Sequence, residues 1–381
     1  MSKVQDYLLA ALLVLLLFLT LLLKHLAGTR VPLKVASLKL KTKTASQLYA
    51  FKRQDNLKGQ PLILLGLAAL EADGRPVTIT TSVDTNLTPP PAQAPVVTVS
   101  SPGTVSVSSQ DGLSLLLGAN ETAKVYYAQQ SYFLVLGGQT KAITKTPILF
   151  TSQDGQPLYL NDYTDLSWDK KVNLNAFAGA IEVVYSATSK HLWAVNELPL
   201  ETYLQGVTEA AADGQAEYLK AMAITARSYA YYHINNGGRH KGEPFHLKNS
   251  RNGNGDDQVY QGYLAAVRVP QIAEAAKQTK GLVVTYNGKP VITPYSAVAG
   301  GRTLSPQEAG WNYNWPWVKS VPDPDTAGLR RLGHGVGLSG LGAKKRAQRG
   351  ATASQILQYY FPGTSLGQVN TDNVKIRVAI Y

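Results

Sequence analysis

Three residues with metal-ligand chemistry are spaced three apart in the chain: His240, Glu243 and His246. On a helix this spacing gathers imidazole and carboxylate groups on one face, where they can hold a metal ion. Gly242 and Pro244 interrupt any helix here, because proline lacks the main-chain N–H that a helix interior needs. We therefore predict no metal site, and no motif in the chain predicts a bound cofactor.

Two glycine-rich segments are similar to known functional motifs but lack a required residue. The run 333–337 reads GHGVG, without the spacing of the dinucleotide-binding motif GxGxxG. The run 337–341 reads GLSGL and lacks the last glycine of a nucleophile elbow. The chain has no cysteine, which excludes thiolate nucleophiles, disulfides and cysteine-bound zinc. Catalysis must therefore use oxygen or nitrogen groups.

The composition is that of a folded, basic protein. Its 381 residues include 37 Lys and Arg against 25 Asp and Glu, giving a net charge of +12. At about 150 residues per domain, this length suggests two folded units. A basic surface suits nucleic acid, an anionic membrane or an anionic wall polymer. Since the chain has no arginine-rich stripe, zinc-finger spacing or ribonucleoprotein motif, we predict no nucleic-acid partner. The 21 tyrosines suit sugar-binding surfaces as well as cores.

The N-terminus contains a hydrophobic segment. Tyr7–Leu23 is a run of 17 uncharged residues, eleven of them leucine, which is just enough to cross the hydrocarbon core of a bilayer. We predict an uncleaved membrane anchor over 1–30, with a cleaved signal peptide as the alternative. The charge rule opposes an external domain, because Lys24, Arg30 and Lys34 follow the segment and only one lysine precedes it.

The elements that would position a site change in type along the chain. Residues 31–170 are predicted to be β-rich, with a proline-rich connector near 88–95 and strands at 96–99 and 104–107. Residues 171–381 are predicted to form a mixed α+β domain. The fold class predicted for the whole chain is α+β, with an N-terminal transmembrane helix.

Helical patterns begin after residue 171. Between Gln215 and Ile234, small and apolar residues recur at i, i+3, i+4 and i+7, which predicts a helix with a narrow face suited to close packing. A second helix is predicted at 271–279, after Pro270. Asn287-Gly288 predicts a hairpin between 282–286 and 291–296. Shorter elements are predicted as strands at 181–185 and 191–195 and as helices near 344–349 and 354–360.

Several motifs in this region resemble a known family. The run LPLETYLQGV at 198–207, followed by Glu209 and by YLKAMAITARSYA at 218–230, resembles the stage II sporulation protein D family, also called the SpoIID/LytB domain. Further matching motifs follow in the family's order: DQVYQG at 257–262, YS at 295–296 with GGRT at 300–303, GHGVGLS at 333–339 with GA at 342–343, and YYFPGT at 359–364. The resemblance covers residues from about 180 to 366.

The resemblance implies a peptidoglycan lytic transglycosylase, or a partner of another wall hydrolase, in which Glu209 is the catalytic acid. The chain departs from the family in two ways. Only Val207-Thr208 separate the run from Glu209, where the family usually has a longer segment ending in Glu-Met-Pro. The zinc site of some members involves cysteine, which this chain lacks, so no metal is carried over.

A single carboxylate is sufficient for this chemistry. Ordinary glycosidases need two carboxylates around the scissile bond. A lytic transglycosylase needs one, which protonates the leaving oxygen and then accepts a proton from the C6 hydroxyl of the same sugar as that hydroxyl attacks. Val207, Ala210 and Ala211 surround Glu209 with apolar groups that would raise its pKa. The alternative is that Glu209 interacts with a helix N-terminus.

The substrate-binding residues carried over from the family have structural alternatives as well. Arg227 could instead form a buried ion pair, Tyr260 could pack in the core, and His334 could belong to a tight turn. The predicted substrate-binding set is Arg227, Gln258, Tyr260, Tyr295, Ser296, Gly300, Gly301, Thr303, His334, Gly335, Gly337 and Ser339.

The function predicted from these residues is cleavage of the MurNAc-GlcNAc β-1,4 bond of peptidoglycan, leaving 1,6-anhydroMurNAc ends. The alternative is a non-catalytic glycan-binding module that recruits or stimulates another cell-wall hydrolase. The expected partners are glycan strands, the membrane through the N-terminal helix and, in the alternative function, another wall hydrolase. The wall substrate places the catalytic domain outside the cytoplasm, on a single-pass membrane anchor.

Overall fold

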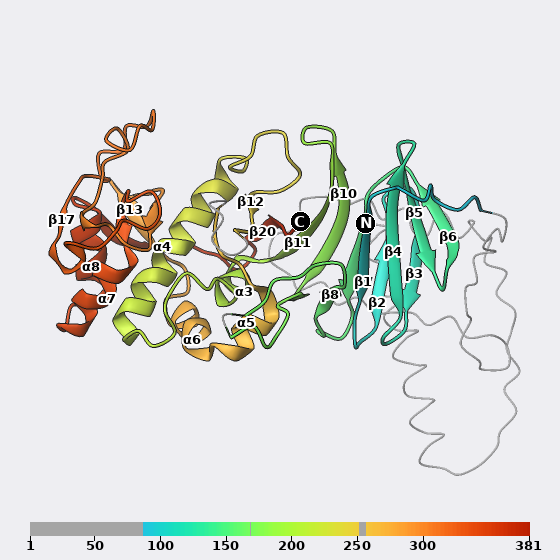
Figure 1. Cartoon of the computed structure of the whole chain (residues 1–381), viewed down its shortest axis with the longest axis horizontal. Coiled ribbons are helices and arrows are strands. Elements are labelled where there is room, and N and C mark those ends of the chain that lie inside the picture. Colours follow the sequence, from blue (N-terminus) through green and yellow to red (C-terminus); the bar gives the residue numbers. More distant parts are fainter. Residues whose placement is uncertain (1–86, 168, 251–256) are drawn as a thin grey trace, which may run out of the picture. The chain divides into compact units, whose positions relative to one another are not determined.

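The computed structural model describes residues 87–167, 169–250 and 257–381, which belong to one compact unit (Figure 1). The transmembrane helix predicted over Tyr7–Leu23 lies outside the described residues. Within the described ranges, no helix has both the length and the apolar composition needed to cross a bilayer. The predicted fold class is therefore corrected, because the described chain is a mixed α+β protein without a transmembrane element.

Short antiparallel strands form the first part of the described chain. β1 (Val96–Ser100) is buried through its centre, and β2 (Val105–Ser108) alternates buried valines with partly exposed serines. This alternation is typical of a strand with one face against a core. Both predicted strands are confirmed. The next strands are β3 (Ser114–Leu117), β4 (Thr122–Ala128), β5 (Ser131–Leu136), β6 (Gln139–Thr144), β7 (Ile148–Ser152), β8 (Leu158–Leu160) and β9 (Ala176–Phe177).

These strands contribute to two sheets that share a hydrophobic core. One sheet has the order β6-β5-β4-β1-β8-β9 and the other β12-β20-β11-β10-β7-β2-β3. The second sheet therefore joins strands from both sides of residue 170, and a division of the chain at that residue stays a prediction. Its later strands are β10 (Ala180–Ser186), β11 (His191–Pro199), β12 (Leu247–Lys248) and β20 (Lys375–Ala379).

The helix predicted at 215–234 is confirmed as α4 (Ala216–Asn235). Figure 1 shows α4 between the strands β10 and β11 and the C-terminal helices. Its buried alanines, among them Ala221, Ala226 and Ala230, let its neighbours approach closely. The other helices are α3 (Leu200–Gln205), α5 (Gly262–Arg268), α6 (Pro270–Gln278), α7 (Gly340–Gln348) and α8 (Ala353–Tyr360), with a short 3₁₀ turn η2 (Pro324–Thr326).

The hairpin at Asn287-Gly288 is confirmed, but its second strand is shorter than predicted. β13 (Leu282–Tyr286) pairs with the two-residue β14 (Lys289–Pro290) on one side and with β19 (Ser365–Gln368) on the other. Pro290 and Pro294 lack the N–H that would continue the ladder. Instead Tyr295–Ser296 forms β15, parallel to β18 (Leu338–Ser339), which brings the YS motif beside the GHGVGLS segment. The remaining strands are β16 (Gly301–Arg302) and β17 (Pro322–Asp323).

Candidate active site

Glu209 lies between α3 and α4, where the chain pairs with the segment before α5. Val207 and Tyr260 form an antiparallel bridge, and the N–H of Thr208 donates to the carbonyl of Val259 at 2.9 Å. This pairing places the carboxyl of Glu209 beside Val259, whose N–H donates to Glu209 Oε1 at 2.7 Å. Glu209 precedes the first residue of α4 by several positions, so the interaction with that helix N-terminus is not what holds it.

The environment of Glu209 shifts the pKa of its carboxyl upwards. Burial raises the pKa of Glu209, while the hydrogen bonds from the Val259 N–H and the Tyr295 hydroxyl lower it, and the balance is a raised pKa. The side chain is still partly exposed. A proton donor that can reach substrate and is stabilised after it has given up its proton has the properties of a general acid.

Tyr295 is itself held by a chain of buried hydrogen bonds. The Tyr203 hydroxyl donates to Gln258 Oε1 at 2.8 Å, and Gln258 Nε2 donates to the Tyr295 hydroxyl oxygen at 2.9 Å. Tyr203 and Gln258 are fully buried. Because the Tyr295 oxygen accepts from Gln258, its own proton is available for the Glu209 carboxyl. Gln258 is thus a positioning residue behind the cavity wall.

Glu209 lines two cavities. The larger, of about 1000 Å³, is bounded by the C-terminal part of α4, the segment after it, and loops that include residues 292–297, 311–315 and 332–334. The smaller, of about 510 Å³, is lined by Ser167, Asp169, and residues of α5 and α6. A linear polymer could therefore occupy space next to Glu209 in both cavities.

Three residues of the predicted binding set line the larger cavity together with Glu209: Tyr295, Ser296 and His334. Ser296 is buried, and its Oγ has no hydrogen-bond partner among the described residues. His334 Nδ1 accepts from the Val336 N–H at 2.9 Å. Burial lowers the pKa of His334 to about 4, so the imidazole is neutral near pH 7.

The structure does not bring Arg227 to the cavity. Its side chain is fully buried and forms a bidentate pair with Glu201, with N–O distances of 2.9 and 2.7 Å. The remaining guanidinium donors reach Thr279 Oγ1 and the carbonyls of Ala276 and Leu282. Every partner belongs to the protein framework, which corresponds to the structural alternative for Arg227.

Tyr260 is also a core residue. It is 1% exposed, its hydroxyl donates to Asn196 Oδ1 at 2.8 Å, and its ring packs against Tyr203 and Phe177. Its contact with substrate in the larger cavity is therefore not supported by the geometry.

The remaining residues of the predicted set shape turns behind the cavity. Gly337 has φ +75°, and an added Cβ would lie 2.1 Å from the carbonyl oxygen of Pro294. Thr303 is fully buried and accepts from the Val321 N–H, and Ser339 caps α7 by accepting from the Gly342 N–H. The residues that hold the backbone in this way, without lining the larger cavity, are Gly300, Gly301, Thr303, Gly335, Gly337 and Ser339.

Several lining residues were missed in the sequence. The cavity also contains Tyr229, His233, Trp311, Tyr313 and Trp315. The signal that could have found the last three is the run WNYNW, in which an aromatic residue stands at every second position. His233 is 8% exposed, and its Nε2 has no partner among the described residues.

Of the described acidic residues that line the two cavities, Glu209 differs from the others in the direction of its pKa shift. Asp257 is buried and accepts hydrogen bonds from Arg239, from His240 at 2.8 Å and from the Lys248 N–H at 2.7 Å. Although burial raises its pKa, these hydrogen bonds and the neighbouring charges hold the pKa of Asp257 below its usual range. Asp169 is paired with Arg268 at 3.0 Å and also has a lowered pKa, mainly because Ser167 donates a hydrogen bond to it. Of these three carboxyls, only that of Glu209 has a raised pKa.

Comparison with known proteins matches part of the chain to a known family. Residues 188–286, which include Glu209 and Gln258, match the family model of SpoIID, described as stage II sporulation protein. This part of the chain is similar to the SpoIID family, as the sequence motifs predicted.

Individual relatives cover different shares of the chain. An uncharacterized protein of Brachyspira hyodysenteriae is 30% identical over 166 residues, covering 43% of this chain and 38% of the relative. Stage II sporulation protein D of Bacillus subtilis is 22% identical over 269 residues, covering 46% of this chain and 76% of the relative. A protein named amidase enhancer, also from Bacillus subtilis, is 45% identical over 49 residues, covering 13% of this chain and 7% of the relative. The chain therefore spans less than half of the length of the Brachyspira protein.

Proposed function

We propose that this protein is a peptidoglycan lytic transglycosylase that cleaves the MurNAc-GlcNAc β-1,4 bond with Glu209 as its single acid and base. The observation that carries the proposal is the Glu209 carboxyl: it has a raised pKa, is hydrogen-bonded by Val259 and Tyr295, and lines cavities of about 1000 and 510 Å³. A glycan strand lying through both cavities would bring a glycosidic oxygen to this carboxyl.

In the first step the Glu209 carboxyl donates its proton to the glycosidic oxygen as the bond from MurNAc C1 to that oxygen breaks. The GlcNAc side leaves as an alcohol. The hydrogen bonds from the Val259 N–H and the Tyr295 hydroxyl stabilise the carboxylate that forms. Glu209 can therefore lose its proton within a largely buried site.

In the second step the C6 hydroxyl of the same MurNAc attacks C1, and its proton passes to the Glu209 carboxylate. The product is a 1,6-anhydro ring, no water is consumed, and Glu209 ends in its starting protonation state. Because the nucleophile belongs to the bound sugar, the reaction gains from proximity. The paired charges of Asp257 and Asp169 leave these residues outside this proton transfer.

A second candidate function is supported by the similarity to the protein named amidase enhancer. In this alternative the cavities bind glycan without cleaving it, and the protein recruits or stimulates another wall hydrolase. Either function requires the described domain to act outside the cytoplasm, where the wall lies.

The experiment that tests the proposal measures release of soluble fragments from purified peptidoglycan by the full chain. We expect release by the wild type and a loss of at least about a hundredfold for Glu209→Gln. Asp213→Asn is the matched control, because Asp213 has 79% of its side chain exposed and pairs with Lys344. If purified wild-type protein releases nothing but a separate wall amidase is stimulated by it, the second function replaces the first.

A further inference from the structure

The larger cavity has one wall made of aromatic rings. Trp311, Tyr313 and Trp315 line it, whereas the residues between them, Asn312 and Asn314, do not. Alternation at every second residue is typical of an extended segment that turns one face towards a site. This face carries three rings and points into the space that also contains Glu209.

The rings form a continuous series of contacts. Tyr313 and Trp315 stack with centroids 4.5 Å apart and planes at 8°, and Trp315 lies 6.2 Å from Trp311. Trp311 in turn lies 4.8 Å from the imidazole of His334. The series therefore leads from the exposed Tyr313 ring to a residue of the site.

The indole N–H groups of Trp311 and Trp315 differ in their hydrogen bonding from those of two tryptophans that pack within the fold. Trp317 donates to the carbonyl of Ile292 at 2.8 Å, and Trp193 donates to Ser189 Oγ at 2.9 Å. Among the described residues, Trp311 and Trp315 have no hydrogen-bond acceptor for their N–H. Both tryptophans are partly exposed and line the cavity, so their indole N–H groups are accessible to a ligand there.

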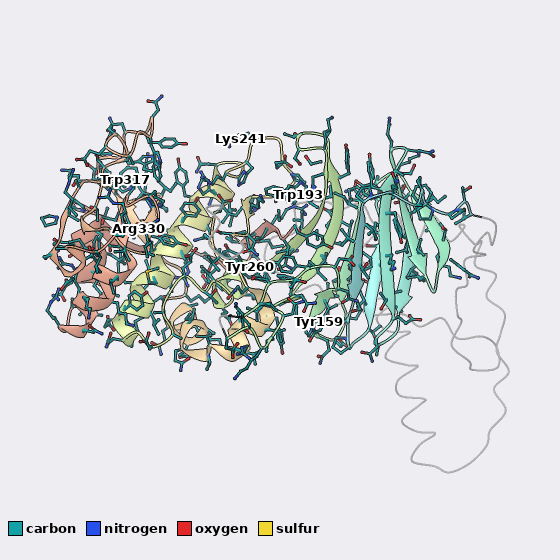
Figure 2. All side chains as sticks on the ribbon, in the orientation of Figure 1. Tyr159, Trp193, Lys241, Tyr260, Trp317 and Arg330 are labelled. Carbon is teal, nitrogen blue, oxygen red and sulfur yellow. The ribbon has the colours of Figure 1, made fainter. Side chains whose placement is uncertain are left out.

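The segment is held in place before any ligand arrives. The main-chain N–H of Trp311 donates to the carbonyl of Pro306 at 2.8 Å, and Gln307 Nε2 donates to the carbonyl of Tyr313 at 2.6 Å. Trp317 anchors its C-terminal end; Figure 2 labels this residue, as well as Lys241 from the segment that follows α4. Rings that are positioned in advance lose little freedom on binding.

We propose that Trp311, Tyr313 and Trp315 form a binding subsite for a pyranose ring of an N-acetylated glycan beside Glu209. A pyranose presents an apolar face of C–H groups, which fits an aromatic ring, and polar groups at its edge, which fit the indole N–H groups. The inference rests on the proposed function, because it assumes that this cavity receives glycan.

The test measures binding, separately from cleavage. The full chain carrying Glu209→Gln is titrated with a neutral hexamer of β-1,4-linked N-acetylglucosamine, and affinity is followed by calorimetry. We expect Tyr313→Ala and Trp315→Ala, each in this background, to weaken binding by roughly tenfold. Trp315→Phe should have a smaller effect than Trp315→Ala, because it keeps an aromatic face and loses only the indole N–H. Tyr263→Ala is the control, because Tyr263 is a 38% exposed tyrosine that lines a different pocket.

The outcomes separate the two proposals. Loss of affinity confined to the variants of the aromatic segment supports the subsite, even if the wild type proves unable to cleave peptidoglycan. Unchanged affinity in Tyr313→Ala, equal loss in Tyr263→Ala, or no binding of the hexamer overturns it, even if cleavage depends on Glu209. Tyr313 is 51% exposed, so its substitution keeps the test valid if Trp315→Ala does not fold.

Discussion

Gln258 Nε2 donates a hydrogen bond of 2.9 Å to the hydroxyl oxygen of Tyr295. The contact fixes the direction of the Tyr295 hydroxyl, whose proton then faces the Glu209 carboxyl. A fully buried amide thereby controls the acid of the site without touching the cavity. The account of Glu209 as a tuned acid depends on this relationship.

Tyr295→Phe removes the donor to Glu209 and keeps the ring. A hydrogen bond to a charged group contributes about 1.5 to 3 kcal/mol, so kcat should fall by roughly tenfold to a hundredfold. Since this hydrogen bond lowers the pKa of Glu209, its loss should also move the alkaline limb of the pH–rate profile to higher pH. The profile of kcat between pH 4 and 9 measures both effects.

The control for this variant is Tyr260→Phe. It also removes one buried hydroxyl hydrogen bond, the 2.8 Å contact with Asn196 Oδ1, but it does not touch Glu209. In this variant both limbs of the pH–rate profile should lie at the same pH as in the wild type. If both variants, or neither, move the alkaline limb, Tyr295 does not set the pKa of Glu209.

Arg227→Met should destabilise the fold. It leaves Glu201 without its bidentate partner, and removing one member of a buried ion pair costs about 3 to 5 kcal/mol. The double variant Arg227→Met/Glu201→Gln should recover part of this loss, because no uncompensated carboxylate remains. Urea unfolding measures both. A single variant with wild-type stability but no glycan binding would instead make Arg227 a substrate-binding residue.

Glu209 should lower the stability of the wild type as pH rises. A carboxyl with a raised folded-state pKa favours folding fully below its ordinary value of 4.5, and this contribution is lost as pH rises through the folded pKa. Glu209→Gln cannot ionise, so its stability relative to wild type should improve between pH 4 and pH 8. Unfolding curves at several pH values test this. A relative stability that falls over the same interval would show that the folded-state pKa is depressed.

Asp257→Asn should act on stability more than on chemistry. It weakens contacts with Arg239, His240 and the Lys248 N–H, so the melting temperature should fall, while kcat of the folded fraction should change far less than in Glu209→Gln. Asp213→Asn should leave the melting temperature nearly unchanged and kcat within about twofold of the wild type, because an exposed ion pair contributes little. Asp256, for which we also expect a small effect of substitution to Asn, lies outside the described residues. An aspartate as essential as Glu209 would favour a two-carboxylate hydrolase.

Local patterns predicted the elements well. The alanine-rich face over 215–234 predicted α4, and Asn287-Gly288 predicted the turn after β13, because both depend on neighbours in sequence. The pairing of β7 with β10 and of β11 with β20 joins segments far apart in the chain, for which the sequence alone offered no signal.

The sequence predicted only part of the site, because the site also depends on contacts between segments far apart in the chain. Glu209, Tyr295, Ser296 and His334 meet at one cavity, although they come from three segments. The guanidinium of Arg227 could bind a substrate as well as it binds the Glu201 carboxylate, and only the packing of the fold decides which of the two it contacts. The glycines of the motifs lie in backbone turns, and the sequence alone does not show whether such a glycine serves a turn or the close approach of a ligand. The WNYNW segment has no regular secondary structure, so no helix or strand pattern pointed to it.

Mass spectrometry of glycan strands after incubation with the full chain tests the central claim most directly. We predict fragments that end in 1,6-anhydroMurNAc and are lighter by one water than the hydrolytic products. The Glu209→Gln variant should yield at least about a hundredfold fewer. Reducing MurNAc ends from the wild type, or anhydro ends at the wild-type rate from Glu209→Gln, would contradict a transglycosylase that uses Glu209 as its single acid and base.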